Sequence, residues 1–334
     1  FLFLFILNKM TNLNTHNVLK ERIEKMSKYH QIEILKILNK FKNIKKNENK
    51  NGTFINLSEL SQNVIDELDG HYFGRGIRDF VFVDDIFNVP KKTGKAILEL
   101  MIKRYPDIRI NFPNGLRADQ LDEEFLDLLE AAGCVHLALA FETATPRLQR
   151  MVGKNMKIEK AHRMADLASQ RFVTCAFFMV GFPTETMEEA RHTIRLAASM
   201  EHLVEPVLSI VRVYPGTPFF SSLNATEEQA RRIEQQSSGQ LQPSAFGDPS
   251  FYGDFFSDEA VPLKGKDIAK LRWEWLRKVV HNPKRIENSH NVIQRFFNHK
   301  QTLEFYSNMF DQPTFDDGDL KRLLKASKTL PRAA

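Results

Sequence analysis

Five apolar segments of the chain each end in polar or turn-forming residues. Such residues could bind a charged small molecule or a divalent cation, because carboxylates attract cations and guanidinium groups attract carboxylates. A single Asp or Glu after an apolar segment is commonly a helix cap or a solvated side chain, but five successive ends of this kind indicate a binding edge. The residues are Asp84 and Asp85, then Asn111 with Arg117, then Glu142 and Thr143, then Gly181 to Glu185, and finally Tyr214 to Pro218.

The five apolar segments are typical of parallel β-strands. They cover residues 80–83, 108–112, 135–141, 172–180 and 207–213. Their spacing along the chain is roughly 27–39 residues, which suits consecutive β–α–β units. We therefore predict an α/β fold with a parallel sheet, either an open doubly wound sheet or a barrel. In a barrel, all five strand ends would meet on one face, where active sites lie.

Helical patterns separate these strands. Leu121, Phe125, Leu128, Leu129 and Ala132 recur at helical spacing, and Gly133 follows as a C-terminal cap. A second helix is predicted over residues 158–168. Thr186 to Glu189 has the sequence of a capping box and predicts the start of a third helix. A further amphipathic helix with a basic outer face is predicted over residues 266–279.

The composition is that of a soluble globular protein. The chain has 334 residues, of which 42% are hydrophobic and 27% charged, and its net charge of +5 does not require a nucleic-acid partner. No apolar run reaches the roughly 18 residues of a membrane span. Two cysteines, Cys134 and Cys175, cannot build a disulfide framework, which favours the reducing cytoplasm. The histidines show no metal-ligand spacing, so no metal site is expected from them.

The composition changes sharply near residue 72. Residues 1–70 contain no alanine, one arginine and 10 lysines, whereas 22 alanines and 20 arginines occur from residue 75 onward. This change indicates either a domain boundary or a join between two unrelated genes, and we favour the join. We expect a leader over residues 1–17, a helical module over 18–72, an α/β unit over 75–222 and a loop with a helical extension over 223–334.

The module over residues 18–72 is predicted to contain two short helices, a basic loop, a short strand and a last helix that Ser61 caps. Its phrases "HQIEILKIL" and "GTFINLSELSQNVIDEL" resemble the extra-terminal (ET or NET) domain of BET-type chromatin proteins. That resemblance implies a peptide partner, which such domains bind by adding a strand to an exposed edge. Here the equivalent stretch, Gly52–Asn56, lacks the acidic residues that the family's strand carries.

The α/β unit resembles a second family. The phrases "FVFVDDIF", "INFPNGLRAD", "LLEAAGCVHLALAFET", "FFMVGFPTETMEEA" and "VYPGTP" occur in this order. Together they are similar to the radical S-adenosylmethionine (radical SAM) superfamily, especially to its members that are often joined to a cobalamin-binding domain. The resemblance covers about residues 76–220. It implies a partial (β/α)6 TIM-like barrel in which a [4Fe-4S] cluster reduces S-adenosylmethionine (SAM) to give a 5′-deoxyadenosyl radical.

The resemblance also implies roles for the residues at the strand ends. Asp84 and Asp85 would meet the methionine amino group of SAM, and Arg117 would lie near its carboxylate or the substrate. Glu142 would lie near the methionine or the ribose. The residues Val180, Gly181, Phe182 and Pro183 would approach the adenine, and Tyr214 would edge the cavity. These types suit the ligand, because a zwitterion needs both charges and a glycine lets the backbone approach a flat base.

One element of the family's pattern is missing. The cluster of this family is held by a C-x3-C-x2-C loop after the first barrel strand, and no such loop occurs here. Three thiolates are required, and Cys134 and Cys175 both look like buried apolar residues. We therefore expect a radical SAM-type enzyme acting on an unidentified small molecule, as a truncated or fused fragment without cluster ligands.

Two alternatives stay open. The chain could be a catalytically inactive fusion protein that binds SAM or, through its N-terminal module, a peptide. Asp84, Asp85 and Glu142 could instead form a divalent-metal site of a hydrolase-like barrel.

Overall fold

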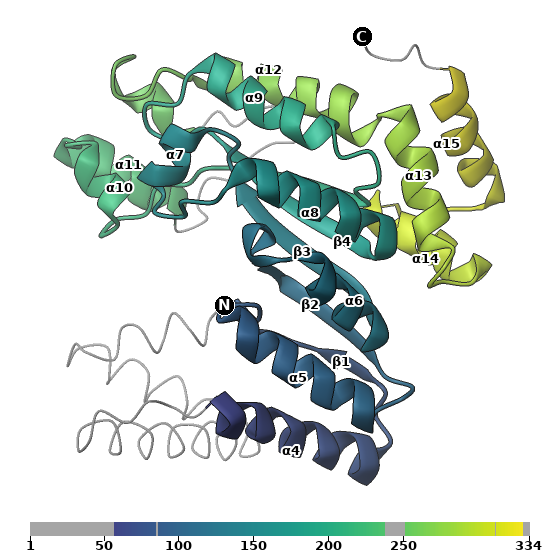
Figure 1. The fold of residues 1–334 in the computed structure, drawn as a ribbon. Helices are drawn as coiled ribbons and strands as arrows, with labels where there is room; N and C mark the ends of the chain where they lie inside the picture. The colour runs from purple at the N-terminus through teal and green to yellow at the C-terminus, as the bar shows by residue number, and fades with distance from the viewer. Residues whose placement is uncertain (1–56, 85, 238–250, 311, 330–334) are drawn as a thin grey trace, which may run out of the picture. The chain divides into compact units, whose positions relative to one another are not determined.

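The structure is a computed structural model that describes residues 57–84, 86–237, 251–310 and 312–329 (Figure 1). Residues from Ser61 onward belong to one compact unit. The leader expected over residues 1–17 lies outside the described residues, as does the expected module over 18–72 up to residue 56.

A parallel sheet of five strands forms the centre of this unit. The strands are β1 (Asp79–Val81), β2 (Arg109–Leu116), β3 (Cys134–Glu142), β4 (Val173–Val180) and β5 (Glu205–Ile210), and all neighbours are parallel. Their spatial order is the order of the chain, β1-β2-β3-β4-β5. A doubly wound sheet reverses its strand order at a switch point, so this sequential order is that of a partial barrel. The predicted strands are confirmed, although β5 ends before Val213.

Helices connect the strands and lie along one face of the sheet (Figure 1). They are α5 (Lys91–Arg104), α6 (Glu123–Ala131), α7 (Pro146–Met151), α8 (Ile158–Arg171) and α9 (Met187–Ala198), with a 3₁₀ turn at Ala118–Gln120. Local sequence sets their ends. Asp122 accepts a hydrogen bond from the Phe125 N–H, and Thr186 with Glu189 forms the predicted capping box.

Gly133 ends α6, as the sequence predicts. Its φ of +80° lies in the left-handed region, and a Cβ added there would lie 2.1 Å from the Ile108 carbonyl oxygen. Only glycine therefore fits where the chain turns from α6 into β3.

The helix α4 (Leu57–Arg75) precedes the sheet and lies beside α5 (Figure 1), where its Asp69 forms an ion pair with Arg104. Its residues Ile65, Leu68 and Tyr72 are buried. The Tyr105 hydroxyl donates to the Ile65 carbonyl oxygen at 3.0 Å. The prediction that Ser61 caps this helix is wrong: the helix begins at Leu57, and Ser61 is buried within it.

The expected helical extension follows β5. It comprises α10 (Pro218–Ser222), α11 (Glu227–Ser237), a 3₁₀ turn η2 (Tyr252–Phe255), α12 (Gly265–Trp275), a π-helical turn η3 (Leu276–Val280), α13 (Pro283–Ile293), α14 (His299–Met309) and α15 (Asp317–Thr329). The buried Arg285 joins α13 to the segment before β5, because its guanidinium donates to the Leu203 and Val204 carbonyl oxygens. Among the described helices, none is long and apolar enough to cross a membrane.

Burial alternates along β2 and along the carboxyl halves of β3 and β4. Side chains such as Phe112, Leu139 and Phe178 are fully covered and belong to the main apolar core. Their neighbours Asn111, Ala140 and Phe177 are only partly covered. Successive side chains of a strand point to opposite faces, so one face is sealed by helices and the other is more open.

Candidate functional site

The predicted site residues follow the carboxyl ends of the strands. Glu142 is the last residue of β3, and Gly181 directly follows β4. Asp84, Arg117 and Tyr214 follow β1, β2 and β5, and 47% of the Tyr214 surface is exposed. Since the strands are parallel neighbours, these positions share one edge of the sheet. Asp85 lies outside the described residues.

Arg117 is held by three protein groups. Its side chain donates to Asp119 at 2.8 and 3.3 Å and to the Lys154 carbonyl oxygen at 2.6 Å. Its backbone exchanges two hydrogen bonds of 2.9 Å with the buried Asn88 side chain. Burial of Asp119 would raise the pKa of its carboxyl, but the hydrogen bond and charge of Arg117 outweigh it and lower that pKa. The guanidinium predicted to face a ligand is therefore engaged within the protein.

Lys154 connects two of the predicted residues. Its ammonium lies 2.9 Å from the Glu142 carboxylate, while its carbonyl oxygen accepts from Arg117. Both side chains of the ion pair are about one quarter exposed. Glu142 has a φ of +65°, an uncommon conformation for a residue with a side chain, which turns the chain at this strand end. The edge thus presents a carboxylate and an ammonium side by side.

The loop after β4 is fixed by Glu185, which is fully buried. One carboxylate oxygen accepts from the Gly181 N–H at 2.5 Å and from the Phe182 N–H at 3.0 Å. The other oxygen is buried without a partner among the described residues. Burial raises the pKa of Glu185 to about 7, although the two N–H groups act in the opposite direction. Tyr252, from the C-terminal extension, donates to the Gly181 carbonyl oxygen at 2.7 Å.

The reason for glycine at position 181 differs from the sequence-based expectation. Gly181 has a φ of +91°, and an added Cβ would lie 2.9 Å from the Phe251 ring. The close approach that needs glycine is therefore made by a phenylalanine of the protein and not by a ligand.

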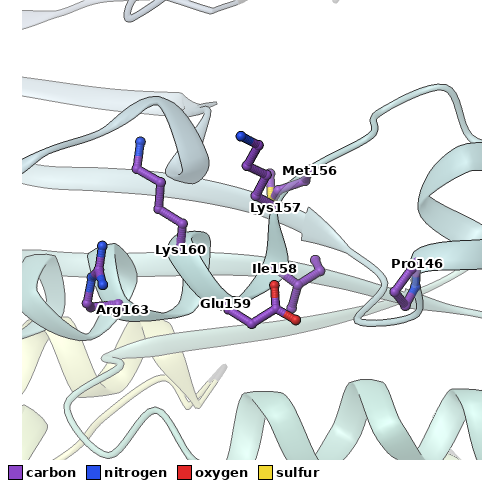
Figure 2. Close-up of a pocket in the computed structure, with 7 residues that line it drawn as sticks. All are labelled: Pro146, Met156, Lys157, Ile158, Glu159, Lys160 and Arg163. Atoms are coloured by element: carbon purple, nitrogen blue, oxygen red, sulfur yellow. The ribbon is translucent and has the colours of Figure 1, made fainter.

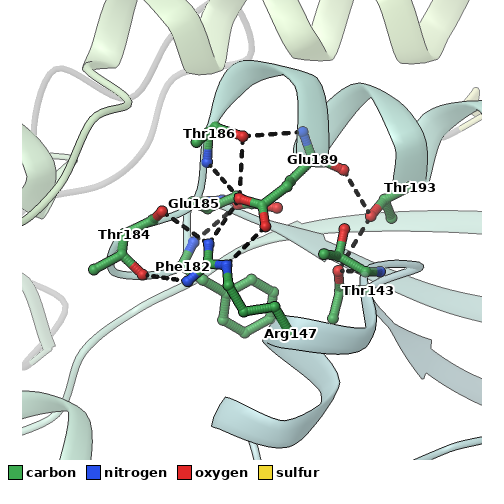
Figure 3. A network of polar contacts seen from close by, with 10 residues as sticks. Thr143, Arg147, Phe182, Thr184, Glu185, Thr186, Glu189 and Thr193 are labelled. Atoms are coloured by element: carbon green, nitrogen blue, oxygen red, sulfur yellow. Dashed lines mark hydrogen bonds and ion pairs between the residues drawn. The ribbon is translucent and has the colours of Figure 1, made fainter.

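A polar network around Arg147 supports the same loop (Figure 3). The Arg147 guanidinium binds Glu189 in a bidentate manner at 2.9 and 2.7 Å. It also donates to the hydroxyl and the carbonyl oxygen of Thr184, whose φ is +60°. The hydrogen bond from Arg147 lowers the pKa of Glu189. This network joins α7, the β4 loop and α9.

A basic pocket of about 490 Å³ lies at the start of α8 (Figure 2). The side chains of Lys157 and Lys160 extend in the same direction there (Figure 2). Lys160 donates to the Asp119 carbonyl oxygen at 2.6 Å, and burial together with the charge of Lys91 lowers the pKa of Lys160. The pocket is lined by Pro146, Met156, Lys157, Ile158, Glu159, Lys160 and Arg163.

The two cysteines do not offer a cluster site. Cys134 is at the start of β3 and Cys175 lies within β4, and both are buried. Burial raises the pKa of both thiols, and the nearby carboxylate of Glu205 adds to the effect at Cys175. Within the described residues, no three His, Cys, Asp or Glu side chains are grouped to hold a metal ion. Since a cluster needs three or four thiolates, the residues present do not fit one.

Sequence reasoning missed two residues of this edge, Lys154 and Tyr252. Lys154 follows a short helix that carries no motif, and Tyr252 lies 71 positions after its partner Gly181. Tyr252 lies in a segment rich in Ser, Gly and Phe, and no periodic pattern in that segment indicates a contact with Gly181. Glu185 belongs to the quoted "GFPTETMEEA" phrase, but nothing in that phrase shows that its side chain turns back to the loop.

A protein-family model matches the part of the chain that contains most of this edge. Residues 49–197 match the family model of the Radical SAM superfamily. The matched part of the chain is thus similar to a radical SAM domain, and it includes residues 49–72, which the sequence patterns had assigned to a separate ET-like module.

Two curated relatives are methyltransferases by name. The chain is 30% identical over 159 residues to an uncharacterised methyltransferase of Pyrococcus horikoshii, covering 47% of this chain and 34% of that protein. It is 21% identical over 235 residues to bacteriochlorophyllide d C-12(1)-methyltransferase of Chlorobaculum tepidum, covering 66% of this chain and 50% of that protein. The chain therefore spans about one third to one half of the length of these relatives.

Solved structures of similar proteins include one with cobalamin bound and one described as cobalamin-dependent. The radical SAM methyltransferase TsrM from Kitasatospora setae, solved with cobalamin and a [4Fe-4S] cluster, has a TM-score of 0.43 and 25% identity over 51% of this chain and 34% of that chain. The cobalamin-dependent SAM radical enzyme OxsB has a TM-score of 0.42 and 12% identity over 76% of this chain and 41% of that chain.

Proposed function

We propose that this chain supplies the SAM-binding barrel of a radical SAM enzyme that acts on an unidentified small molecule. The observation that carries the proposal is the Glu142–Lys154 pair at the carboxyl edge of a radical SAM domain. The methionine part of SAM has an ammonium and a carboxylate, so it can meet the Glu142 carboxylate and the Lys154 ammonium at once. Both side chains are partly exposed and can reach a ligand.

The strand ends fit SAM but not the cluster. When bound, SAM supplies a sulfonium whose reductive cleavage gives the 5′-deoxyadenosyl radical in this superfamily. In this chain, Glu142 and Lys154 would hold the methionine part, and Asp84 would add a carboxylate for the ammonium. The loop of Gly181 and Pro183 would border the adenine. Because the two buried cysteines cannot hold the cluster, the role that we propose for this chain's own residues is to bind and orient SAM.

The names of the relatives favour a methyltransferase as the whole enzyme. Both curated relatives are methyltransferases by name, and cobalamin is bound in one of the similar structures. We extend this to the present chain as a proposal: the reaction transfers a methyl group, and a cobalamin takes part. The peptide partner implied by the ET-like phrases stays a second proposal and rests on residues 18–72.

Calorimetric titration of the full chain with SAM tests the proposed function. We expect saturable binding that weakens about tenfold or more in Glu142→Gln and in Lys154→Met, since each removes a charge-assisted contact of about 1.5–3 kcal/mol. Glu287→Gln and Lys266→Met, which change exposed residues of the helical extension, should bind as the wild type does. A wild-type chain that binds no SAM would refute the proposal.

A further inference from the structure

Several polar backbone groups of the loop between β4 and α9 already form hydrogen bonds within the protein. The N–H groups of Gly181 and Phe182 both point to Glu185, and the Gly181 carbonyl oxygen accepts from Tyr252. The Thr184 N–H donates to the Ala260 carbonyl oxygen at 2.9 Å. Hydrogen bonds within the protein therefore hold this loop in one conformation before any ligand binds.

The two side chains that hold this loop, Glu185 and Tyr252, come from different parts of the chain. Glu185 lies four residues after Gly181 and folds back on the same loop. Tyr252 belongs to the turn η2 in the C-terminal extension and is fully buried. Its neighbour Phe251 packs against the Gly181 Cα, which has no room for a Cβ. The C-terminal extension thus contacts Gly181, the residue that links β4 to the loop, through both Phe251 and Tyr252.

We propose that Glu185 and Tyr252 are positioning residues of the SAM-binding edge, which together hold the Gly181–Phe182 peptide groups in place for the ligand. This inference rests on the proposed function. Neither side chain needs to touch SAM, because both are completely buried and act through the backbone that they hold.

The clamp does not require an ionised Glu185, because a carboxyl oxygen can accept the two N–H bonds in the ionised and in the neutral state. The charged and titratable groups that face Glu185 are Arg147 of α7, Glu189 of α9 and Tyr252 of η2. Arg147 and Glu189 are bound to each other, and burial together with the charge of Glu185 raises the pKa of Tyr252. Glu185 is the member whose pKa, raised by burial to about 7, lies in the neutral range.

The first test measures the clamp without any ligand. Amide hydrogen exchange of Gly181 and Phe182 in the full chain should be slow in the wild type. It should stay slow in Glu185→Gln, whose amide oxygen can still accept, and become at least tenfold faster in Glu185→Leu. Exchange that is equally slow in Glu185→Leu would show that the carboxylate does not hold the loop.

The second test measures SAM affinity in the same variants. Tyr252→Phe should weaken SAM binding about fivefold or more, because it leaves the buried Gly181 carbonyl oxygen unpaired. Tyr105→Phe is the control: it also removes a buried hydroxyl, one that contacts the Ile65 carbonyl oxygen and the Asp69 carboxylate at the C-terminal end of α5, and it should leave the affinity unchanged.

The outcomes separate the two proposals. Wild-type SAM binding that Tyr252→Phe and Glu185→Leu leave within twofold would overturn the positioning role and keep the proposed function. If Glu185→Leu does not fold, the SAM affinity of Tyr252→Phe decides. A wild type that binds no SAM refutes the proposed function and the positioning role with it, whereas the exchange experiment still reports whether the clamp exists.

Discussion

Glu142 and Lys154 are the pair of opposite charges on which the account of this edge depends. They lie 2.9 Å apart, yet the two side chains keep about a quarter of their surface exposed. Arg117 and Asp119, by contrast, satisfy each other, and Asp119 is only 4% exposed. The two pairs therefore differ in their acids, because Asp119 is buried although Arg117 is 26% exposed, whereas Glu142 and Lys154 are both partly exposed and can bind a ligand.

The thiols of Cys134 and Cys175 should be unreactive in the folded protein. Burial raises the pKa of both thiols, so almost no thiolate is present near neutral pH. A disulfide reagent at pH 8 should therefore label neither cysteine in the native chain and both after unfolding in guanidinium. Rapid labelling of the native protein would show that one of them is exposed and could serve as a ligand.

Glu185 should make the stability of the protein depend on pH. Burial raises the pKa of its carboxyl from 4.5 to about 7, so the folded protein binds this proton more strongly than the unfolded chain does. The resulting stabilisation is complete below about pH 4.5 and is lost as the pH rises through 7, by about 3 kcal/mol in total. Denaturant unfolding at several pH values should show this slope in the wild type.

Glu185→Gln is the matched variant for this slope, because it keeps the shape and removes the proton. Its free energy of unfolding should change less than that of the wild type between pH 5 and pH 8. Parallel profiles for the two proteins would contradict the raised pKa of Glu185.

At the scale of elements, two glycines that turn the chain provide a matched pair. Gly133 and Gly153 both have positive φ, +80° and +70°. A Cβ at Gly133 would lie 2.1 Å from the Ile108 carbonyl oxygen, whereas nothing lies within 4 Å of one at Gly153. Gly133→Ala should thus lower the free energy of unfolding by about 3 kcal/mol or more, and Gly153→Ala by about 1 kcal/mol. Equal effects in thermal melts would mean that the turn at Gly133 can move away from Ile108 at no cost.

Most elements of the barrel could be predicted from sequence because their signals are local. Apolar runs gave the five strands, and Thr186 to Glu189 gave the start of α9. The prediction for Ser61 was wrong because the residue type alone does not show whether a serine caps a helix or lies inside it. Here the helix already includes Leu57, four residues before Ser61. The pairings of Lys154 and Tyr252 could not be predicted, since each depends on a segment that the fold alone brings near.

At the scale of the whole molecule, β1 is an edge strand in the described part of the chain and pairs only with β2. Apolar side chains of and beside this strand are exposed, with Val81 at 58% and Val83 at 64%. An uncovered apolar edge strand favours association with another chain. We expect the protein to self-associate, as measured by sedimentation velocity.

A double variant tests whether this edge is responsible. Val81→Lys with Val83→Lys should reduce self-association, because charged side chains at an edge oppose strand pairing. Leu276→Lys, at a residue that is 41% exposed on η3, is the control and should change little. A wild type that is a monodisperse monomer would contradict the prediction.

Hydrogen–deuterium exchange with and without SAM tests the central claim most directly. If SAM binds at the carboxyl edge of the sheet, as we propose, it should slow exchange in the segments around Glu142–Lys154 and Gly181–Thr186. Exchange in α13 to α15 should stay unchanged. Protection confined to those C-terminal helices, or no protection anywhere at a saturating SAM concentration, would contradict the account.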